Sequence, residues 1–519
     1  MTINQNNSNH TFSSHNLDNS PRKINKLINK FSGYIWPIKR QELSKFLFIT
    51  LLMFCILFIQ NLIRALKDSI VTTMIGAETI SFLKFWGVMP CAFLMTAIYV
   101  KLVNRMKAEN IFYLIISIFL AFFSLFAYVI FPNHEILHLS PTTAQNLIAS
   151  LPNLKWFILL LSKWSFSLFY IIAELWPNVA FALLFWQFVN NITTVEESKR
   201  FYPLFGLLSQ TGIYLAGQFL ENLSHINEYV AAKFSLQASF HTLSVQIILT
   251  IVLILGIIGI KTFWLLNHKV LDKEHMALLR FKAKKKNMTI AESFQMILSS
   301  RHIRLIAALL ICYGIAINLV EGPWKAAATK IYKTPTEYAA FIGNYLSYTG
   351  AFTILFVVLG SNIVRKLGWF TAAIITPIIV FTTGILFFAV NNFESSACLI
   401  VASFILTDPA LIAITMGAIQ NVLSKSSKYT LFDSTKEMAY VPLDKEIKIK
   451  GKAAADVLGT KLGKSGSAFL QSLVFIILPS ANYQSISVCL MFIFIITCLI
   501  WFWAVKELNK EYKKSVKFS

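Results

Sequence analysis

The sequence predicts an all-α membrane protein that crosses the bilayer about twelve times, in two halves of six helices each. Of the 519 residues, 56% are hydrophobic and the mean hydropathy is +0.62, which is more apolar surface than a water-soluble fold can bury. The apolar residues gather in runs of about 20, the length that spans a bilayer core. A basic linker, residues 266–301, divides these runs six and six. That arrangement is typical of secondary transporters.

The expected spans follow the apolar runs. In the first half, residues 46–265, they are 46–66, 82–103, 110–131, 156–192, 201–221 and 241–265. In the second half, residues 302–505, they are 302–322, 340–360, 370–390, 397–423, 463–479 and 485–505. A polar and basic tail, 1–45, precedes the first half, and a basic tail, 506–519, follows the second. The run 156–192 is long for one span, but two helices there would place the chain ends on opposite sides of the membrane.

Loop charges set the expected orientation. The connections 132–154, 391–397 and 480–484 contain no Lys or Arg, whereas the alternate connections and the linker are basic. Because basic loops stay in the cytoplasm, we expect both chain ends and the linker there. The net charge of +22 lies largely in these loops and tails, where it faces anionic lipid rather than nucleic acid. Three lysines on the outer side are exceptions: Lys325, Lys330 and Lys333.

Charged residues interrupt the first, fourth, seventh and eleventh spans. They are Arg64, Lys67, Asp68, Glu174, Glu321, Lys461 and Lys464. A charge within the bilayer core is costly unless it faces a partner or a polar cavity. A Lys or Arg near a helix end can reach the membrane surface, but Glu174 has apolar sequence on both sides. Four such sites in both halves therefore favour one shared polar cavity.

Two glycine-containing stretches indicate what the cavity holds. Gly322-Pro323 follows Glu321 and removes a backbone donor, so we expect the seventh helix to loosen beside the cavity. The stretch 463–466, Gly-Lys-Ser-Gly, has the wrong spacing and no preceding strand for a Walker motif. Its small residues would still let backbone N–H groups and Lys464 approach a phosphate. Lysines beside such backbone suit an anionic substrate with several charges, such as a phosphate ester.

No catalytic or metal-binding pattern accompanies these charges. The six cysteines lie singly in apolar runs, and His134 and His138 lie in a loop without further ligands. No Ser/His/Asp nucleophile arrangement is present in the sequence. We therefore expect no metal, no cofactor and no enzymatic activity.

Six longer strings are more specific than any single charge: RALKD (64–68), AELW (173–176), ITTVEESKRFYPLFG (192–206), NLVEGPWK (318–325), KYTLFDSTKEMAYVPLD (428–444) and GKSGSAFLQ (463–471). Together they resemble the nucleotide transporters of the bacterial and plastid ATP/ADP translocase type, from about Lys39 to Tyr512. The resemblance implies a twelve-helix, major-facilitator-like fold in the inner membrane of an obligate intracellular bacterium. It also implies import of host ATP in obligate exchange for ADP. We expect the chain to act as a monomer.

The family's charged residues that are important for transport match Lys67, Glu174, Glu321 and Lys464. The resemblance implies that the two lysines contact phosphates. The two glutamates would contact other polar parts of the nucleotide, or pair with the lysines between substrates. Further candidates for the substrate cavity are Arg64, Asp68, Trp176, Trp324, Lys325 and Lys461, of which the two tryptophans would stack on the base or serve packing.

Two positions depart from the family pattern, and alternatives to exchange stay open. Gly322-Pro323 stands where the family has Val-Thr, and Pro177 stands where it has Gly. Both changes lie beside a matched glutamate, so they put the base preference and the exchange partner in doubt. The first alternative is proton-coupled net import of nucleotide, with a glutamate as proton carrier. The second is a membrane enzyme that uses the basic segment 425–461, which lacks paired carboxylates. A scaffold role would leave the intramembrane charges unexplained.

Overall fold

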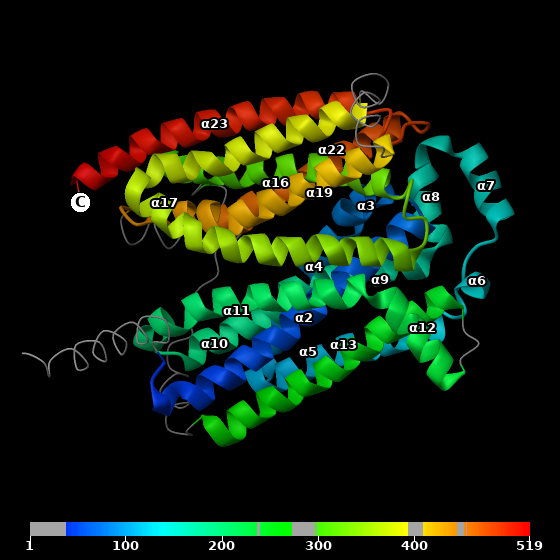
Figure 1. Cartoon of the computed structure of the whole chain (residues 1–519), viewed down its shortest axis with the longest axis horizontal. Coiled ribbons are helices and arrows are strands. Elements are labelled where there is room, and N and C mark those ends of the chain that lie inside the picture. Colours follow the sequence, from blue (N-terminus) through cyan, green and yellow to red (C-terminus); the bar gives the residue numbers. More distant parts are fainter. Residues whose placement is uncertain are drawn as a thin grey trace, which may run out of the picture.

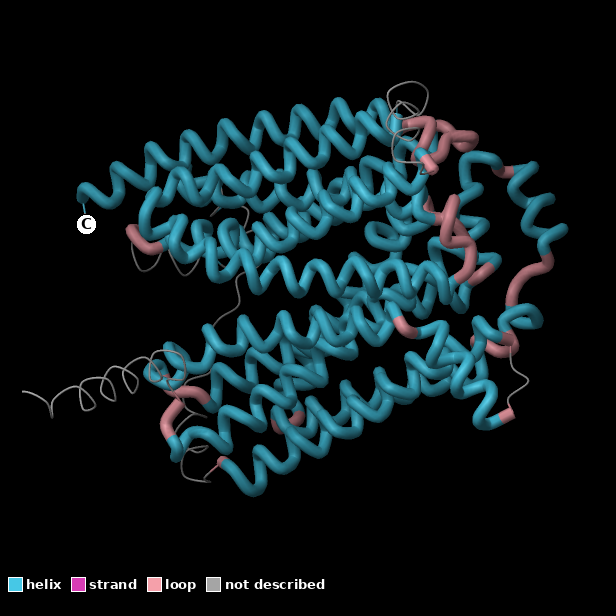
Figure 2. Tube along the Cα trace, in the orientation of Figure 1, coloured by secondary structure: helices cyan, strands magenta, loops and turns pink. Residues whose placement is uncertain are grey.

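The computed structural model describes residues 38–235, 239–271, 295, 298–392, 408–443, 451–452 and 454–518. Most of the N-terminal tail and of the basic linker lies outside the described residues, as does the start of the expected span 397–423. Every regular element in the described ranges is helical (Figure 2). This confirms the predicted all-α class.

The first half is a bundle of long helices with short helices in its connections. Its elements are η1 (Arg40–Glu42), α2 (Leu43–Met74), α3 (Thr79–Phe82), η2 (Leu83–Val88), α4 (Met89–Arg105), α5 (Ala108–Leu125), η3 (Phe126–Ile130), α6 (His134–Leu137), α7 (Pro141–Ser150), η4 (Pro152–Leu154), α8 (Lys155–Ser162), α9 (Trp164–Trp176), η5 (Pro177–Phe185), α10 (Trp186–Ile192), α11 (Val195–Glu221), α12 (Leu223–Phe234), α13 (Phe240–Leu265) and η6 (Leu266–Val270). Several η elements are π-helical turns that continue the preceding helix, as η2 does between α3 and α4.

The second half has longer and fewer elements. They are α16 (Arg301–Ala328), α17 (Pro335–Asn392), α19 (Pro409–Ser427), η8 (Lys428–Phe432), α20 (Asp433–Tyr440), η9 (Ala455–Gly459), α22 (Thr460–Ile477) and α23 (Ser487–Phe518). Within α17 the chain turns at Gly368, which has a φ of 79°. Glycine adopts this positive φ at little steric cost because it has no Cβ. This turn separates the expected spans 340–360 and 370–390.

Nine described helices are long and apolar enough to cross a membrane. They correspond to the expected spans one to four, six to nine and twelve. The other three expected spans coincide at least in part with α11, α19 and α22, which fall outside those nine. The multi-span character is therefore confirmed, while the count of twelve stays a prediction.

Two local expectations differ from the structure. The run 156–192 breaks at Lys163, whose φ and ψ of −115° and 46° are not helical, so only Trp164–Ile192 forms the span. The expected loosening at Gly322-Pro323 is wrong, because α16 stays helical through Pro323 to Ala328. A Cβ on Gly322 would lie 2.6 Å from the Tyr483 ring. This glycine therefore permits close packing rather than an unwound backbone.

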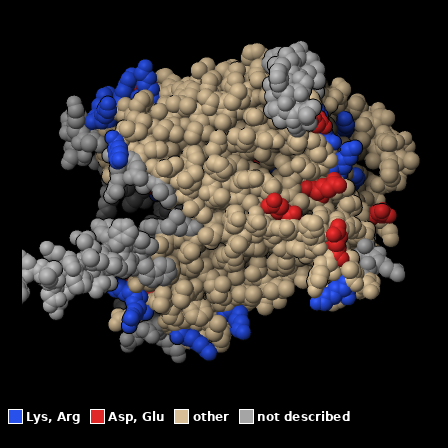
Figure 3. All heavy atoms as spheres, viewed as in Figure 1, with Lys and Arg blue, Asp and Glu red and all other residues tan. Residues whose placement is uncertain are grey.

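The two halves lie side by side and diverge toward the end of the molecule where the C-terminus lies (Figure 1). Figure 3 shows a hollow between the halves at that end, which we call the open end. At the opposite, closed end the halves touch directly. A Cβ on Gly217 of α11 would lie 2.5 Å from the backbone nitrogen of Ser347 in α17, so these two helices approach almost backbone to backbone.

Candidate functional site

A cavity of about 360 Å³ lies between the halves and is lined by α2, η2, α4, α9, η5, α16, α19, η8 and α22. Its charged lining residues are Arg64, Lys67, Asp68, Lys84, Glu174, Glu321, Lys325, Lys425, Lys428, Lys461 and Lys464. Eight of these side chains are cationic and three are carboxylates, which leaves an excess of five positive charges. A low-dielectric cavity with such an excess favours a ligand that carries several negative charges.

The structure brings Lys67, Glu174, Glu321 and Lys464 together in this one cavity, although they come from four helices of both halves. Four of the further candidates, Arg64, Asp68, Lys325 and Lys461, also line it. That these side chains bind substrate stays a prediction.

Lys67 is buried and fully paired. Its Nζ donates to Asp68 Oδ1 at 2.8 Å and lies 3.0 Å from Glu174 Oε2. It also lies 3.9 Å from the centre of the Tyr170 ring, which favours the cation further. Only 4% of the Lys67 side chain is exposed, whereas 31% of Glu174 is exposed. Lys67 thus joins α2 to α9 within the first half.

Glu321 lies at the centre of a second cluster that joins the two halves. Its carboxylate is 3.4 Å from Lys84, 3.5 Å from Lys325, 3.7 Å from Arg64 and 3.8 Å from Lys425. Arg64 and Lys84 belong to the first half, and the other two lysines belong to the second. Glu321 therefore pairs with cations from both halves at once.

One contact joins the two clusters: Lys325 Nζ donates to Asp68 Oδ2 at 2.9 Å. Within the Glu321 cluster, Lys84 Nζ also donates to Asn318 Oδ1 at 2.7 Å. Lys67, Lys84 and Lys325 therefore each have a short hydrogen bond to a protein oxygen.

Lys464 differs from those three lysines. It is exposed to the cavity, and among the described residues its ammonium has neither a hydrogen bond nor an ion pair. The stretch around it is helical, because η9 runs directly into α22. The expected approach of backbone N–H groups to a phosphate is therefore wrong here, since those groups lie inside a helix. The glycine at 463 serves packing, because a Cβ there would lie 2.9 Å from the Ile311 carbonyl oxygen.

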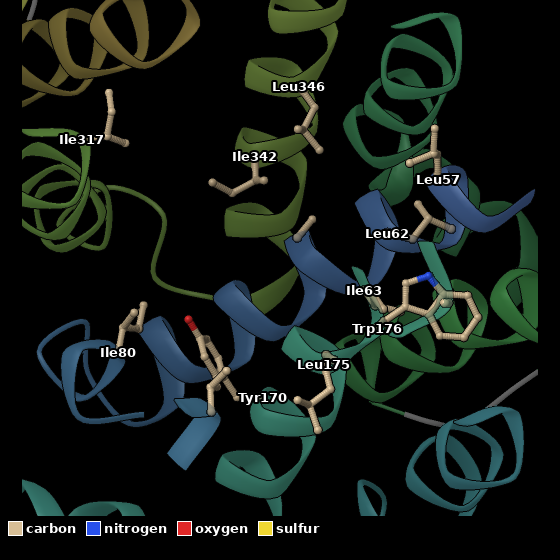
Figure 4. Close-up of a cluster of buried hydrophobic side chains, with 14 of the residues drawn as sticks. Leu57, Leu62, Ile63, Ile80, Tyr170, Leu175, Trp176, Ile317, Ile342 and Leu346 are labelled. Carbon is tan, nitrogen blue, oxygen red and sulfur yellow. The ribbon is translucent and has the colours of Figure 1, made fainter. Parts of the chain in front are cut away.

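The two tryptophan candidates lie outside the cavity lining. Trp176 is buried and donates to the carbonyl of Ile56 at 3.1 Å. It lies near Leu62 and Ile63 of α2 (Figure 4). Trp324 donates to the carbonyl of Ile414 at 2.9 Å and is also buried. Both rings fill helix contacts, and neither is placed to stack on a ligand in the cavity.

Sequence reasoning missed three lysines of the cavity: Lys84, Lys425 and Lys428. Lys84 lies within an expected span, so the argument used for Glu174 would have found it. Lys425 and Lys428 lie in the segment 425–461, which the sequence predicts to be a basic loop. The loop prediction is wrong for its first part, because the helix continues from α19 through η8 and α20 to Tyr440 and buries Lys425.

Comparisons with known proteins agree with this architecture. The family model described as TLC ATP/ADP transporter matches residues 22–512. A relative named ADP,ATP carrier protein 4, from Rickettsia bellii (strain RML369-C), is 98% identical over 519 residues, and the match covers 100% of each chain.

Two solved structures share the fold at 13% identity. A D-xylose–proton symporter has a TM-score of 0.54 and covers 90% of this chain and 97% of its own. A bacterial homologue of the iron transporter ferroportin, in an inward-facing state, has a TM-score of 0.52 and covers 90% of this chain and 100% of its own. The major-facilitator-like fold is thereby confirmed, and the chain belongs to the TLC ATP/ADP transporter family.

Proposed function

We propose that this protein is a nucleotide antiporter that imports external ATP in obligate exchange for internal ADP. The observation that carries the proposal is the cavity between the halves, with its excess of five positive charges. Two halves that diverge at one end and touch at the other fit a transporter that opens its site to each side in turn. The cavity then holds the nucleotide, and Lys67, Glu174, Glu321 and Lys464 form its polar wall.

Within this wall the residues have different roles. Lys464 has no ion pair among the described residues, so it is placed to contact a phosphate directly. Lys67 is already paired with Asp68 and Glu174, so it positions these two carboxylates and adds to the positive potential of the cavity. Glu321 holds cations of both halves together while the cavity is empty.

The ion pairs favour exchange over proton coupling. Glu321 is within 4 Å of four cations and Glu174 is 3.0 Å from Lys67, so both glutamates already serve as ion-pair partners in the cavity. The same cross-half pairs would hold the empty protein in one state. A nucleotide from either side releases that state by offering its phosphates to the cations, which couples import to export.

The proposal extends to location and orientation. We place the chain in the inner membrane of the bacterium as a monomer, supplied with ATP by the host cell. The open end carries the C-terminus (Figure 1), and the basic loops support a cytoplasmic location for that end. The structure then corresponds to an inward-open state.

Uptake of labelled ATP into vesicles that contain the purified protein tests the function. We expect uptake with ADP inside and none in vesicles without nucleotide, even under a pH gradient. Robust accumulation of ATP in nucleotide-free vesicles, driven by a pH gradient alone, would overturn exchange in favour of proton-coupled import. With Glu321→Gln, we expect slower exchange or a weaker requirement for internal nucleotide, because the link between the halves is lost.

A further inference from the structure

Lys425 is a buried cation of the cavity that lacks a hydrogen bond. Only 10% of its side chain is exposed, and its Nζ has no hydrogen-bond partner in the part of the chain that the structure describes. Its ion-pair partner, Glu321 Oε1, is 3.8 Å away, and the centre of the Tyr345 ring is 4.9 Å away. An ammonium that is buried without a hydrogen bond costs free energy, unless a ligand supplies the missing acceptor.

Arg64 also lacks a hydrogen bond to any residue within the described ranges, although 35% of its side chain is exposed. It is 3.7 Å from Glu321 Oε1. In contrast, Lys67, Lys84 and Lys325 donate hydrogen bonds of 2.8, 2.7 and 2.9 Å to protein oxygens. Arg64 comes from α2 of the first half and Lys425 from α19 of the second, and both contact the same carboxylate oxygen from opposite halves.

We propose that Arg64 and Lys425 form a phosphate subsite, and that Glu321 takes the place of the phosphate while the cavity is empty. This inference rests on the proposed function and names a part of the site that binds the phosphate chain of a nucleoside di- or triphosphate. A phosphate oxygen offers both cations the short, charge-assisted hydrogen bond that they now lack. Glu321 can release them, because Lys84 and Lys325 remain within 3.4 and 3.5 Å of it.

The placement of the subsite has a consequence for coupling. A single carboxylate of α16 pairs with both Arg64 and Lys425, at 3.7 and 3.8 Å. A phosphate bound between the two cations replaces Glu321 as their shared partner, which is the release of the cross-half ion pairs that the proposed exchange requires. Lys464, on α22, lines the same cavity without a partner and is free to hold another phosphate of the chain.

The subsite is tested with inorganic tripolyphosphate, which has the phosphate chain of a nucleotide but neither base nor ribose. The measurement is the shift in thermal unfolding of the purified full-length protein as tripolyphosphate is added, which gives an apparent affinity without any transport step. We expect Lys425→Gln to weaken that affinity about tenfold or more, since a charge-assisted hydrogen bond is lost. Lys425→Arg should retain part of the affinity because it keeps the cation.

Lys428→Gln is the matched control. Lys428 lies one turn further along the same helix and lines the same cavity, so its loss removes the same charge. Its Nζ already donates to Asp433 Oδ2 at 2.8 Å, so we expect a loss clearly smaller than that of Lys425→Gln. Equal losses in the two variants would mean that only the general positive field acts, which overturns the subsite. An unmodified protein that tripolyphosphate does not stabilise overturns it as well.

Two further measurements keep the outcomes separate. If Lys425→Gln does not insert, Arg64→Gln takes its place, because 35% of the Arg64 side chain is exposed and its loss strains the fold less. Normal tripolyphosphate affinity in Arg64→Gln overturns the subsite. The vesicle exchange assay on the unmodified protein tests the function independently. Failed exchange with intact tripolyphosphate binding overturns the antiporter and leaves the subsite standing.

Discussion

The cavity and the closed end of the interface between the halves are built from different interactions. The cavity walls carry eight cations and three carboxylates, and the buried ammonium of Lys425 lacks a hydrogen bond to the described residues. At the closed end, hydrogen bonds join neutral side chains, and the carboxylate of Glu221 accepts from the neutral Asn344 Nδ2 at 3.0 Å. Gln218 Nε2 donates to Ser347 Oγ at 3.1 Å, and Trp86 Nε1 donates to Ser472 Oγ at 3.4 Å.

This difference teaches how the two regions can work together. Neutral, close-packed contacts can separate without leaving a charge buried and unpaired, so the closed end is suited to open repeatedly. In the cavity, the ion pairs of Glu321 and Asp68 join the halves, and an anion offers the excess cations another partner. A polyanionic substrate therefore acts on the ion pairs of the cavity, while packing decides how easily the closed end opens.

The largest expected effect comes from removing a paired charge of the cavity. Lys67→Gln leaves Glu174 without its 3.0 Å partner and Asp68 with Lys325 as its remaining cation. Because Asp68 stays paired and Glu174 is 31% exposed, the cost should stay below the roughly 3–5 kcal/mol of a fully unpaired buried charge, and we expect lower thermal stability together with loss of ATP uptake. Thermal unfolding of the purified variant measures this. Unchanged stability would contradict the role of Lys67 as the residue that joins α2 to α9.

The second effect separates binding from stability. Lys464→Gln removes an ammonium with no protein partner in the described residues, so the unfolding temperature without ligand should stay unchanged. Uptake of ATP should fall about tenfold or more, because a charge-assisted hydrogen bond to phosphate is lost. Lys464→Arg should retain part of the uptake, because arginine keeps the cation that donates this bond. Vesicle uptake and thermal unfolding are measured on the same preparation. Normal uptake in Lys464→Gln would remove this residue from the phosphate site.

The contrast between these two lysines also shows what the sequence could and could not predict. Charged residues within apolar runs identified Lys67, Glu174, Glu321 and Lys464, because their cost in a bilayer is a local property. Which lysine is paired depends on where α9 and α16 pass α2, and no local pattern contains that information. The loop prediction for Lys425 is wrong because the helix of α19 extends past its apolar part into a polar stretch. The loosening predicted at Gly322 is wrong as well, since the close approach of Tyr483 explains this glycine.

A third variant acts on the closed end. A Cβ at Gly343 of α17 would lie 2.7 Å from the backbone nitrogen of Glu221 and 2.8 Å from the carbonyl oxygen of Gly217. Gly343→Val therefore cannot keep the present contact between α11 and α17, and such overpacking costs about 1–3 kcal/mol. We expect the population to shift toward the state that is open at this end. Single cysteines at the closed end should react faster with a membrane-impermeant thiol reagent added outside.

Gly206→Val is the control for that variant, because it places the same side chain on α11 where a Cβ meets no atom within 4 Å. We expect its closed-end cysteines to react at the rate of the unmodified protein. Equal acceleration by both variants would mean that the valine loosens the helix rather than the contact between the halves.

The smallest expected effect tests whether the closed end depends on one latch or on many weak contacts. Trp86→Phe removes the 3.4 Å hydrogen bond to Ser472 but keeps an aromatic ring beside Phe85, whose ring centre lies 5.0 Å away. A long, half-exposed hydrogen bond contributes less than about 1 kcal/mol, so the thiol reactivity at this end should rise less than about fivefold.

Ser472→Ala removes the same bond from the other side. If the bond is intact and acts alone, the double variant should match either single one. A rise in thiol reactivity as large as that caused by Gly343→Val would instead mean that the Trp86–Ser472 hydrogen bond alone keeps the closed end shut. Neutral packing would then not be what holds the halves together, since the close approach of α11 and α17 is untouched in this variant.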